Sequence, residues 1–516
     1  MKIFNTAQMI ALEKQTTILE SINSLDLIEK TATAIKNWVD ANLNPQLPYY
    51  IFCGTGDNGA DGLALARILI KDGYEVEVYL IKFSTELSSD CASNEKRIWE
   101  SGAEINYVNA KSDLPMLVGK GVIIDAIFGV GLNREVTGLA GETIEYINKK
   151  DLPIVSLDIP SGMLSDTISD DWPIIMSDVV LSYQFPKLCF FLPENEDYID
   201  NWTILDIGLS YDSIDKITTK YNYLLNIETN MLLTDTPKFA HKGDNGHGLL
   251  IAGSKGMTGA SILSARAAMR SGIGKLSIAV PDRNYAIVQM SVPEAMCLVQ
   301  GEVYINRVPD NIENFDFVAI GPGLGLTKET EKLVADVLKK VQQPMVIDAD
   351  ALNTIAKNTK LFSKIPKFSI LTPHIGEFER LVNKKFENSI ERIDALQAFA
   401  IENQVVMVLK GAHSAIALPN GEIYFNSTGN PGMATAGTGD VLTGVLLALL
   451  AQGYHSIDAA LLGVNLHGLA GDLAMEEQST ESLIASDVIE NLGKAFRVLR
   501  NIGKEDELKE EDLEEL

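Results

Sequence analysis

The sequence predicts an α/β protein of two domains, each built around a mainly parallel sheet. Its 516 residues exceed what one ordinary hydrophobic core holds. Short apolar runs alternate with helical patterns in both halves, and a less patterned region separates the halves at about residues 211–238. A hydrophobic content of 46% with 40 glycines is typical of globular α/β structure rather than of disorder or a coiled coil.

The first half contains four apolar runs that are typical of buried strands. They cover residues 49–53, 75–81, 122–128 and 153–159, and a glycine-rich loop and a helix at about 60–71 follow the first of them. Strand, loop and helix in this order predict right-handed crossovers and a parallel sheet. We therefore expect a Rossmann-like three-layer domain here.

The pattern restarts after residue 238. Six further runs are expected to be strands, with helices between them, at residues 249–252, 275–280, 317–320, 345–347, 369–371 and 405–409. The sequence shows no internal repeat. We place the first domain at 1–225, the second at 226–503, and a solvated acidic tail at 504–516.

Charge and cysteine content restrict the classes of partner. The net charge of −27 argues against nucleic acid, whose phosphates need a basic footprint, but leaves small phosphorylated ligands open. The four cysteines show no metal or disulfide spacing, which fits a reducing cytoplasm. The N-terminus lacks the apolar core of a signal peptide, and the apolar run at 441–451 is too short to span a bilayer. We expect a cytoplasmic protein without a membrane partner.

Three polar segments follow strands of the first half, where ligands bind in open parallel sheets. They are the glycine-rich loop 54–62, Asp125 with the loop 129–135, and the segment 158–162. Asn58, Asp125 and Ser161 offer hard oxygen ligands without a cluster of acids, which suits potassium better than magnesium or zinc. The alternative for each residue is a helix cap or a fixed turn.

In the second half the segment 430–440 combines glycines, threonines and a single carboxylate, Asp440, directly before an apolar run. Such a loop presents free amides at a helix N-terminus, which favours a polyphosphate. Asp440 is then best explained as a base that takes a proton from an attacking hydroxyl. The alternative is that Asp440 only caps the helix.

His374 follows a proline in a loop and is either a substrate contact or a structural residue. The absence of a His-x-x-x-His motif and of a P-loop motif argues against zinc hydrolysis and against a P-loop enzyme.

Three motifs of the first half resemble a known family. Asp-Asn-Gly-Ala-Asp-Gly, Ile-Asp-Ala-Ile-Phe-Gly-Val-Gly-Leu-Asn-Arg and Asp-Ile-Pro-Ser-Gly are similar to the domain that epimerises hydrated NADH and NADPH, over residues 1–225. The resemblance implies potassium on Asn58, Asp125 and Ser161, and catalysis by Asp158. It places the hydrated nucleotide on Asp158 and on two segments: Asp57, Asn58, Gly59, Ala60 and Asp61; and Gly129, Val130, Gly131, Leu132, Asn133, Arg134 and Glu135. Asp57 and Ala60 depart from the usual motif, so their effect on ligand affinity is open.

The second half resembles the ribokinase-like dehydratases of hydrated NADH and NADPH over residues 236–503. The ordered motifs are Gly-Pro-Gly-Leu-Gly, Asp-Ala-Asp-Ala-Leu-Asn, Thr-Pro-His-Ile-Gly-Glu, Lys-Gly-Ala-His-Ser, Ala-Gly-Thr-Gly-Asp and Leu-His-Gly-Leu-Ala-Gly-Asp. The resemblance implies a ribokinase-like fold, with hydrated substrate on Ala260, Gly325, His374 and Asp440. It places the nucleotide on Lys410, Gly411, Ala412, His413, Ser414 and Gly439, with Mg²⁺, and does not choose between ADP and ATP.

The main hypothesis is a bifunctional metabolite repair enzyme, an NAD(P)H-hydrate epimerase joined to an ADP- or ATP-dependent NAD(P)H-hydrate dehydratase, which we expect to form a homo-oligomer. One alternative is a ribokinase-like kinase that releases a stable phosphorylated metabolite, with a non-catalytic N-terminal binding domain. A second is that the first domain is a binding module like the scaffold proteins of RNA metabolism. Free phosphate among the products would exclude the kinase, and an RNA-binding assay would test the module.

Overall fold

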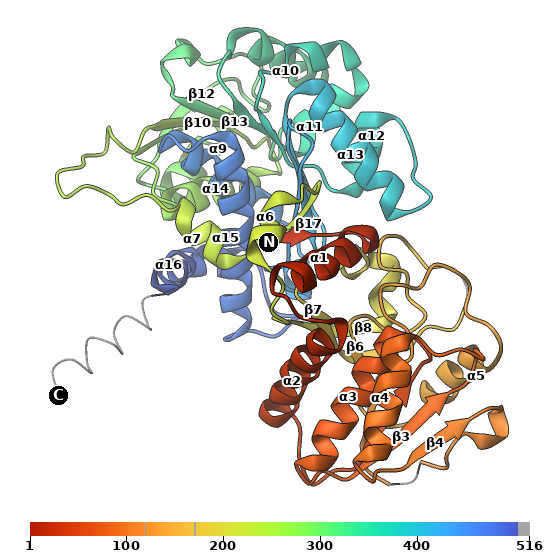
Figure 1. Ribbon diagram of the computed structural model, residues 1–516. Helices are drawn as coiled ribbons and strands as arrows, with labels where there is room; N and C mark the ends of the chain where they lie inside the picture. The colour runs from red at the N-terminus through yellow and green to blue at the C-terminus, as the bar shows by residue number, and fades with distance from the viewer. Residues whose placement is uncertain (118, 170–171, 504–516) are drawn as a thin grey trace, which may run out of the picture. The chain divides into compact units, whose positions relative to one another are not determined.

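The computed structural model describes residues 1–117, 119–169 and 172–503, so the acidic tail 504–516 lies outside the described residues. The chain divides into two compact units (Figure 1). One unit, called the first domain below, comprises Lys2–Tyr221 with Asn388–Ile390. The other, the second domain, comprises Met1, Asn222–Glu387 and the chain from Glu391 onward. The division into compact units does not show which residues each activity requires, so the functional boundary at residue 225 stays a prediction.

The first domain has a seven-stranded sheet in the order β4-β3-β2-β5-β6-β7-β8, and its neighbouring strands are parallel. This confirms the expected parallel α/β class. The strands are β2 (Tyr49–Cys53), β3 (Val76–Ile81), β4 (Ile105–Val108), β5 (Val122–Ala126), β6 (Ile154–Leu157), β7 (Ser177–Tyr183) and β8 (Ile199–Leu205). The sequence reasoning did not anticipate β4, β7 and β8. β4 and β8 form the edges of the sheet and are less buried than the central strands, with one buried residue each.

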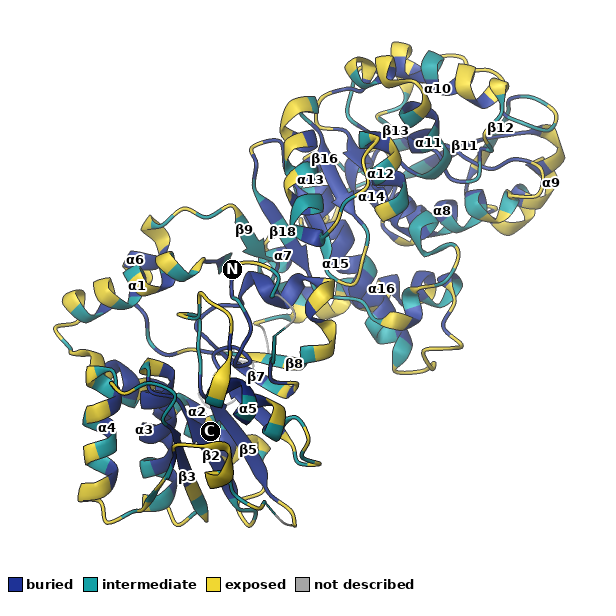
Figure 2. Ribbon diagram, turned by 90° about the vertical axis from the view of Figure 1, so that its right-hand side faces the viewer, coloured by how far each residue is buried: buried dark blue, intermediate teal, exposed yellow. Residues whose placement is uncertain are grey.

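The helices of this domain are α1 (Thr6–Leu19), α2 (Ser24–Asn42), α3 (Asp57–Lys71), α4 (Ser89–Glu100), α5 (Gly138–Ile147) and α6 (Tyr211–Lys216). α3 packs between α2 and α4 and against β2, β3 and β5 (Figure 2). It begins at Asp57, earlier than expected, so the glycine-rich motif forms its first turns. A Cβ at Gly59 would lie 2.0 Å from the carbonyl oxygen of Gly54, so this glycine permits close helix–strand packing rather than a loop.

The second domain carries the strand order β18-β17-β16-β15-β14-β13-β10-β11-β12. The strands are β10 (His247–Ile251), β11 (Lys275–Val280), β12 (Met296–Val299), β13 (Phe317–Ile320), β14 (Met345–Ile347), β15 (Ile370–Leu371), β16 (Val406–Leu409), β17 (Ser414–Ala417) and β18 (Ile423–Asn426). Pairing is parallel from β12 to β16, and β16, β17 and β18 form an antiparallel extension. The sequence reasoning missed β12, β17 and β18.

Helices cover this sheet on both faces, as Figure 1 shows. They are α7 (Asn226–Leu232), α8 (Thr258–Arg270), α9 (Asp282–Ser291), α10 (Lys328–Lys340), α11 (Ala349–Lys357), α12 (Ile375–Val382), α13 (Ser389–Asn403), α14 (Thr438–Ala451), α15 (Ser456–Met475) and α16 (Ala485–Asn501). The apolar run after Asp440 is α14, which is buried and packs against α8, α15 and β13. Among the described helices, none combines the length and apolar character that crossing a membrane requires.

The less patterned region between the domains is structured. It contains α6, the short strand β9 (Tyr221–Tyr223) and α7. α7 packs on α15 and α16, and the buried hydroxyl of Thr229 donates to Asn465 Oδ1 over 3.1 Å. Elements this short give no readable periodicity, which is why the sequence suggested a linker.

Candidate active sites

The first candidate site is centred on Asp158, which directly follows β6. Its φ of 68° lies in the left-handed region, a strained conformation for an aspartate that the surrounding structure must enforce. One carboxylate oxygen, Oδ1, lies 2.9 Å from Lys187 Nζ, and the other accepts the Val130 N–H over 3.2 Å. The backbone of the loop 129–135 is thereby joined to this carboxylate.

Lys187 is fully buried and makes several polar contacts. Its ammonium donates to Ser182 Oγ, to the Tyr183 carbonyl and to the Phe185 carbonyl at 3.0, 3.1 and 3.0 Å. A buried ammonium needs such partners, and the ion pair with Asp158 supplies the balancing charge. Lys187 therefore holds one oxygen of Asp158 in a fixed position.

Further acidic groups gather around this pair. Burial raises the pKa of Glu13, on α1, to about 7, with a further contribution from Asp158. Burial also raises the pKa of Asp61 well above its ordinary value, with Glu13 and Asp158 adding to the effect. The pKa of the Tyr183 phenol is raised by burial first and then by Asp61. Several groups at this site can thus hold a proton near neutral pH.

The three oxygen residues expected to bind a cation lie on the same side of the sheet. Asn58 Oδ1 is buried and has no hydrogen-bond partner among the described residues, while Asn58 Nδ2 donates to the Leu157 carbonyl over 3.4 Å. Asp125 is fully buried and accepts from Ser161 through both its hydroxyl and its amide, at 2.5 and 2.8 Å. A buried amide oxygen without a donor, at the same end of the strands as a carboxylate held by neutral donors, fits a weakly charged cation.

The second candidate site surrounds the N-terminus of α14. Asp348 is buried; its Oδ1 lies 2.9 Å from Lys410 Nζ and its Oδ2 accepts from the Thr443 hydroxyl at 2.8 Å. A Cβ placed on Gly439 would lie 3.3 Å from Lys410 Nζ and 3.9 Å from Asp348 Oδ2. The glycine therefore leaves open the space in front of the lysine and the helix N-terminus.

Asp440 is half-buried in the first turn of α14. Burial raises the pKa of its carboxyl to about 7; Asp348 raises it further, and Lys410 partly offsets both effects. Burial lowers the pKa of Lys410, but Asp348 and Glu377 outweigh that effect and leave its pKa raised. The lysine thus stays charged, and the proton-exchanging group near neutral pH is Asp440.

Gly325 and Ala260 lie on neighbouring segments of the second domain. The Gly325 N–H donates to Asp350 Oδ2 at 2.8 Å, and Asp350 is one of the carboxylates that raise the pKa of Asp440. A Cβ on Gly323 would lie 3.0 Å from the Ala260 Cβ. Loop 321–325 and the start of α8 therefore lie together, and Asp350 links this loop to the group of carboxylates that includes Asp440.

Two family models match this chain. The model of the YjeF-related protein N-terminus matches residues 24–189, and the model of NAD(P)H-hydrate dehydratase matches residues 248–494. The bifunctional NAD(P)H-hydrate repair enzyme Nnr of Moorella thermoacetica is 33% identical to this chain over 524 residues, which cover 98% of each protein. The chain belongs to the bifunctional NAD(P)H-hydrate repair enzymes. This confirms the family indicated by the sequence motifs.

Other members of this repair-enzyme family are similar at the same level. The Nnr protein of Thermofilum pendens is 31% identical over 514 residues, covering 97% of each chain. Among solved structures, the ADP/ATP-dependent NAD(P)H-hydrate dehydratase of Bacillus subtilis, co-crystallised with ATP and Mg²⁺, is 32% identical; it covers 55% of this chain and 100% of its own, with a TM-score of 0.49.

Of the residues expected to bind nucleotide in the dehydratase part of this repair enzyme, residues 410–414 run from the end of β16 to the first residue of β17, and Gly439 lies in α14. Gly411 and Ala412 are exposed at the tip, and the Ser414 hydroxyl donates to the Gly411 carbonyl at 3.3 Å. His413 Nδ1 lies 2.9 Å from Ser427 Oγ, and burial lowers the pKa of this imidazole. Lys410 lies at the start of this loop and is the member that reaches Gly439.

His374 has a clear local role. It precedes α12, and its Nδ1 accepts the Gly376 N–H over 3.1 Å, so it caps the helix. Its backbone forms an isolated parallel bridge with Lys410, so His374 lies beside the first residue of the loop expected to bind nucleotide, and its side chain is exposed. The cap is structural; the expected substrate contact remains a prediction.

In the epimerase part, the structure brings Gly129 and Val130 to Asp158 but leaves Asn133, Arg134 and Glu135 exposed. The sequence reasoning gave no role to Glu13 or Lys187, and it quoted the motif that begins at Asp348 without assigning that carboxylate a role. For Lys187 a signal existed: one cation within the apolar run 185–192 indicates a buried charge with a partner.

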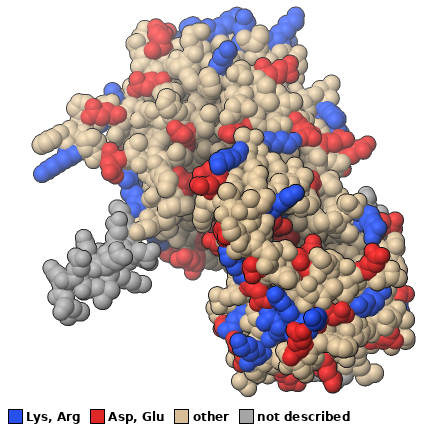
Figure 3. Space-filling model, in the orientation of Figure 1, with Lys and Arg blue, Asp and Glu red and all other residues tan. Residues whose placement is uncertain are grey.

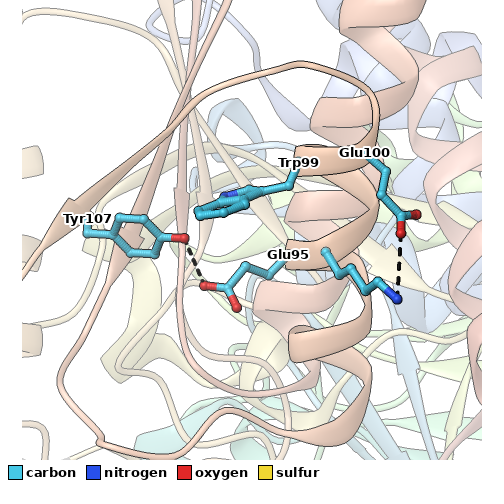
Figure 4. Close-up of a pocket in the computed structure, with 5 residues that line it drawn as sticks. Glu95, Trp99, Glu100 and Tyr107 are labelled. Carbon is cyan, nitrogen blue, oxygen red and sulfur yellow. Dashed lines mark hydrogen bonds and ion pairs between the residues drawn. The ribbon is translucent and has the colours of Figure 1, made fainter.

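A shallow hollow on the first domain is separate from these residues (Figure 4). It is lined by side chains of α4 and β4: Glu95, Lys96, Trp99, Glu100 and Tyr107. The Tyr107 hydroxyl donates to Glu95 Oε1 over 3.1 Å. None of the expected site residues lines this hollow, so we assign it no part in the repair chemistry.

Proposed function

We propose that the second domain dehydrates the S form of hydrated NADH and NADPH at the expense of ADP or ATP, with Asp440 as the general base. The observation that carries this proposal is the Asp440 carboxyl, with a pKa of about 7, at a helix N-terminus beside Gly439 and Lys410. A base works best when its pKa lies near the operating pH. The same helix N-terminus favours the phosphates that the reaction needs.

The chemistry follows from the leaving group. The hydrate carries a hydroxyl at C6 of the nicotinamide ring, and hydroxide leaves poorly. Asp440 takes the hydroxyl proton while the hydroxyl oxygen attacks the terminal phosphorus of the nucleotide, releasing AMP from ADP or ADP from ATP. Phosphate then departs with the C6–O bonding electrons, and loss of a proton from the neighbouring carbon restores the dihydropyridine. The amides of residues 437–439, at the N-terminus of α14, would stabilise charge on the transferred phosphoryl group.

The nucleotide is assigned to the segment Lys410, Gly411, Ala412, His413 and Ser414 together with Gly439, and Mg²⁺ would enter with it. Three neighbouring carboxylates, Asp348, Asp350 and Asp440, outnumber the single Lys410 beside them. That excess of negative charge fits a divalent cation, which is usually held by substrate phosphates and one or two carboxylates. When bound, Mg²⁺ would neutralise phosphate charge. Ala260, Gly325 and His374 are assigned to the hydrated substrate.

We assign epimerisation of the hydrates to the first domain, with Asp158 as the proton-transfer group. The strained backbone of Asp158 and its pairing with Lys187 support this assignment. The first turn of α3 (Asp57, Asn58, Gly59, Ala60 and Asp61) and the loop 129–135 would hold the hydrated nucleotide. Asp57 is exposed, so its extra charge can be screened by solvent.

Potassium is assigned to Asn58, Asp125 and Ser161. The buried, unpartnered Asn58 Oδ1 supports it, because an oxygen without a donor is satisfied by a cation. Bound potassium would orient the neighbouring loops and place positive charge at this side of the sheet. We keep the functional boundaries 1–225 and 226–503, a cytoplasmic location and a homo-oligomer as further parts of the proposal.

The decisive experiment incubates the purified chain with mixed hydrate epimers, Mg²⁺ and either nucleotide. The absorbance of NADH reports recovery, and free phosphate is measured in parallel. We expect both epimers to be consumed, with one phosphate per NADH formed. A stable phosphorylated organic product would instead identify a kinase. Consumption of the S epimer alone would contradict the epimerase assignment.

A further inference from the structure

Helix α15 anchors the whole segment that leads to Asp440. At the start of that segment, Asp472 accepts the Gly429 N–H at 2.9 Å through Oδ2 and the Asn430 side-chain amide at 3.0 Å through Oδ1. At its end, His467 Nε2 lies 2.9 Å from the carbonyl oxygen of Thr438. Both contacts come from the Leu-His-Gly-Leu-Ala-Gly-Asp motif at 466–472, which the proposed chemistry does not use.

Two glycines let α15 approach this closely. A Cβ on Gly468 would lie 2.4 Å from the Thr428 carbonyl oxygen, and one on Gly471 would lie 2.1 Å from the sulfur of Met433. The Thr428 hydroxyl also donates to the Asn465 carbonyl at 3.0 Å. At Thr428 the distance between the segment and α15 is therefore set by backbone atoms, and at Met433 by a side chain.

The His467 contact with Thr438 is a hydrogen bond in which the imidazole is the donor. A carbonyl oxygen only accepts, so Nε2 carries the proton and donates it to Thr438. Burial lowers the pKa of His467 to about 4, so the ring is neutral near neutral pH. The contact is thus a neutral hydrogen bond from a side chain that is itself half-buried in α15.

The accepting carbonyl belongs to the same peptide unit as the Gly439 N–H. A trans peptide is planar, so its C=O and N–H point in opposite directions. Holding the Thr438 oxygen on the α15 side therefore aims the Gly439 N–H away from α15. A donor on the carbonyl also polarises the unit and strengthens its N–H as a donor. Gly439 is the residue that leaves room beside Lys410, where the nucleotide is expected.

We propose that His467 is a positioning residue of the dehydratase: it fixes the Thr438–Gly439 peptide so that the Gly439 amide points at the phosphoryl group being transferred. This inference rests on the proposed function of the second domain. His467 touches neither substrate nor nucleotide and acts only through the peptide. Its effect should consequently fall on turnover more than on ground-state binding.

The test compares His467→Met with His467→Gln in the full-length chain. The two side chains have similar length and volume, but only Gln carries a terminal N–H₂ that can reach the Thr438 carbonyl. With purified S hydrate, nucleotide and Mg²⁺, we expect Met to lower kcat about 10–100-fold, somewhat less than complete loss of an oxyanion-type donor. KM for the nucleotide should change less than about 3-fold in the Met variant. In the His467→Gln variant, kcat should lie within about 5-fold of the wild-type value.

Epimerisation by the first domain serves as the control in the same preparations and should be unchanged in both variants. Wild-type kcat in the Met variant, or equal losses in Met and Gln, would overturn the positioning role. If Met does not fold, His467→Asn replaces it, because its shorter amide cannot reach the carbonyl and should lose turnover where Gln does not. Failure of the unchanged chain to form NADH from the S hydrate would instead overturn the proposed function itself.

Discussion

At the scale of single residues, the second site separates two aspartates by their environments. Asp348 is buried against Lys410 and Thr443, so its charge is already paired. The Asp440 carboxyl is partly shielded from solvent and lies near other carboxylates, so its pKa is raised to about 7. Opposite environments of this kind support a structural role for Asp348 and the proposed proton transfer by Asp440.

The first prediction is that Asp440→Asn lowers dehydration by about 10²–10⁴-fold, as loss of a general base does. The amide keeps the shape but cannot take the hydroxyl proton. Nucleotide should still bind, because Lys410 and Gly439 are unchanged. Turnover and nucleotide affinity measured on one preparation check this. Turnover within a few-fold of wild type would show that Asp440 only caps α14.

The same substitution should change stability in a pH-dependent way. In the folded chain the pKa of Asp440 is raised from 3.8 to about 7. Ionisation of Asp440 therefore opposes folding. The free energy of unfolding of the wild-type chain falls as the pH rises from the unfolded to the folded pKa of Asp440, and Asp440 causes no further loss at higher pH. We expect Asp440→Asn to be more stable at about pH 8, by on the order of 2 kcal/mol, and equal to wild type near pH 4. Denaturant unfolding at both pH values measures this; an equal gain at both would contradict it.

In the first domain, Lys187 and Asp158 should behave as a coupled pair. Lys187→Met leaves an uncompensated buried carboxylate and should destabilise the first domain by about 3–5 kcal/mol. Adding Asp158→Asn removes that charge, so the double variant should recover part of the loss. Thermal unfolding of the four chains gives the coupling, and additive losses would show that the pair is not coupled. Epimerisation should be lost in all three variants and dehydration of the S form kept.

The cation assignment gives a prediction of its own. Asp125→Ala removes the buried carboxylate that Ser156 and Ser161 hold in place. Epimerisation should be abolished, while dehydration of the S epimer stays intact. Removing potassium from the wild-type buffer should have the same selective effect. A wild-type epimerisation rate in the variant would show that the cation assignment is wrong.

At the scale of elements, the N-terminus of α14 shows two different uses of glycine. Gly437 has a φ of 98°, and a Cβ there would lie 2.5 Å from a methyl of Leu263. Gly439 is not in the left-handed region, but a Cβ there would lie 3.3 Å from Lys410 Nζ. One glycine thus permits the turn into the helix, and the other leaves space for a ligand.

We therefore expect opposite phenotypes for the two alanine variants. Gly437→Ala should destabilise the second domain by roughly 1–3 kcal/mol, because the backbone is strained and Leu263 is in contact. Gly439→Ala should fold normally but bind nucleotide at least about 10-fold more weakly, since a methyl group enters the phosphate space. Thermal unfolding and nucleotide titration of both variants distinguish these uses. Normal nucleotide binding by Gly439→Ala would place the phosphates elsewhere.

At the scale of the whole molecule, each domain carries its own candidate site. Acidic and basic side chains are interspersed on the face that Figure 3 draws. The residues that follow Tyr221 belong to the second compact unit: the Leu224 N–H donates to the Phe425 carbonyl at 2.9 Å, and Leu224 is part of the core. A second-domain fragment that begins after α7 would lose these contacts.

The corresponding prediction concerns fragments. Residues 1–221 and 222–516 should each fold and keep one activity, epimerisation and dehydration respectively. A fragment 233–516 should be less stable than 222–516, because it lacks Leu224 and the contact of Thr229 with Asn465. Thermal unfolding of the two versions checks this. Equal stability would show that α7 is dispensable, and insoluble fragments would indicate a shared core.

The sequence by itself determined the α/β class, most of the central strands and the family, because apolar periodicity and glycine-rich motifs are local patterns. It also singled out Asp440 and Asp158 as polar residues directly after apolar runs or before a helix. The sequence did not show that the first turn of α3 is helical rather than a loop. A glycine that lets a helix pack closely on a strand cannot be told, from the sequence, from a glycine that forms a turn.

Only the tertiary structure decided which groups stand next to these residues. Lys410 meets Asp348 across 62 positions of the chain, and His467 meets Thr438 across 29. Whether a carboxylate holds its proton near neutral pH depends on the burial and the charges brought to it by other strands and helices. No local pattern encodes that arrangement, so the chemistry of Asp440 and the roles of Lys187 and His467 became visible only in the fold.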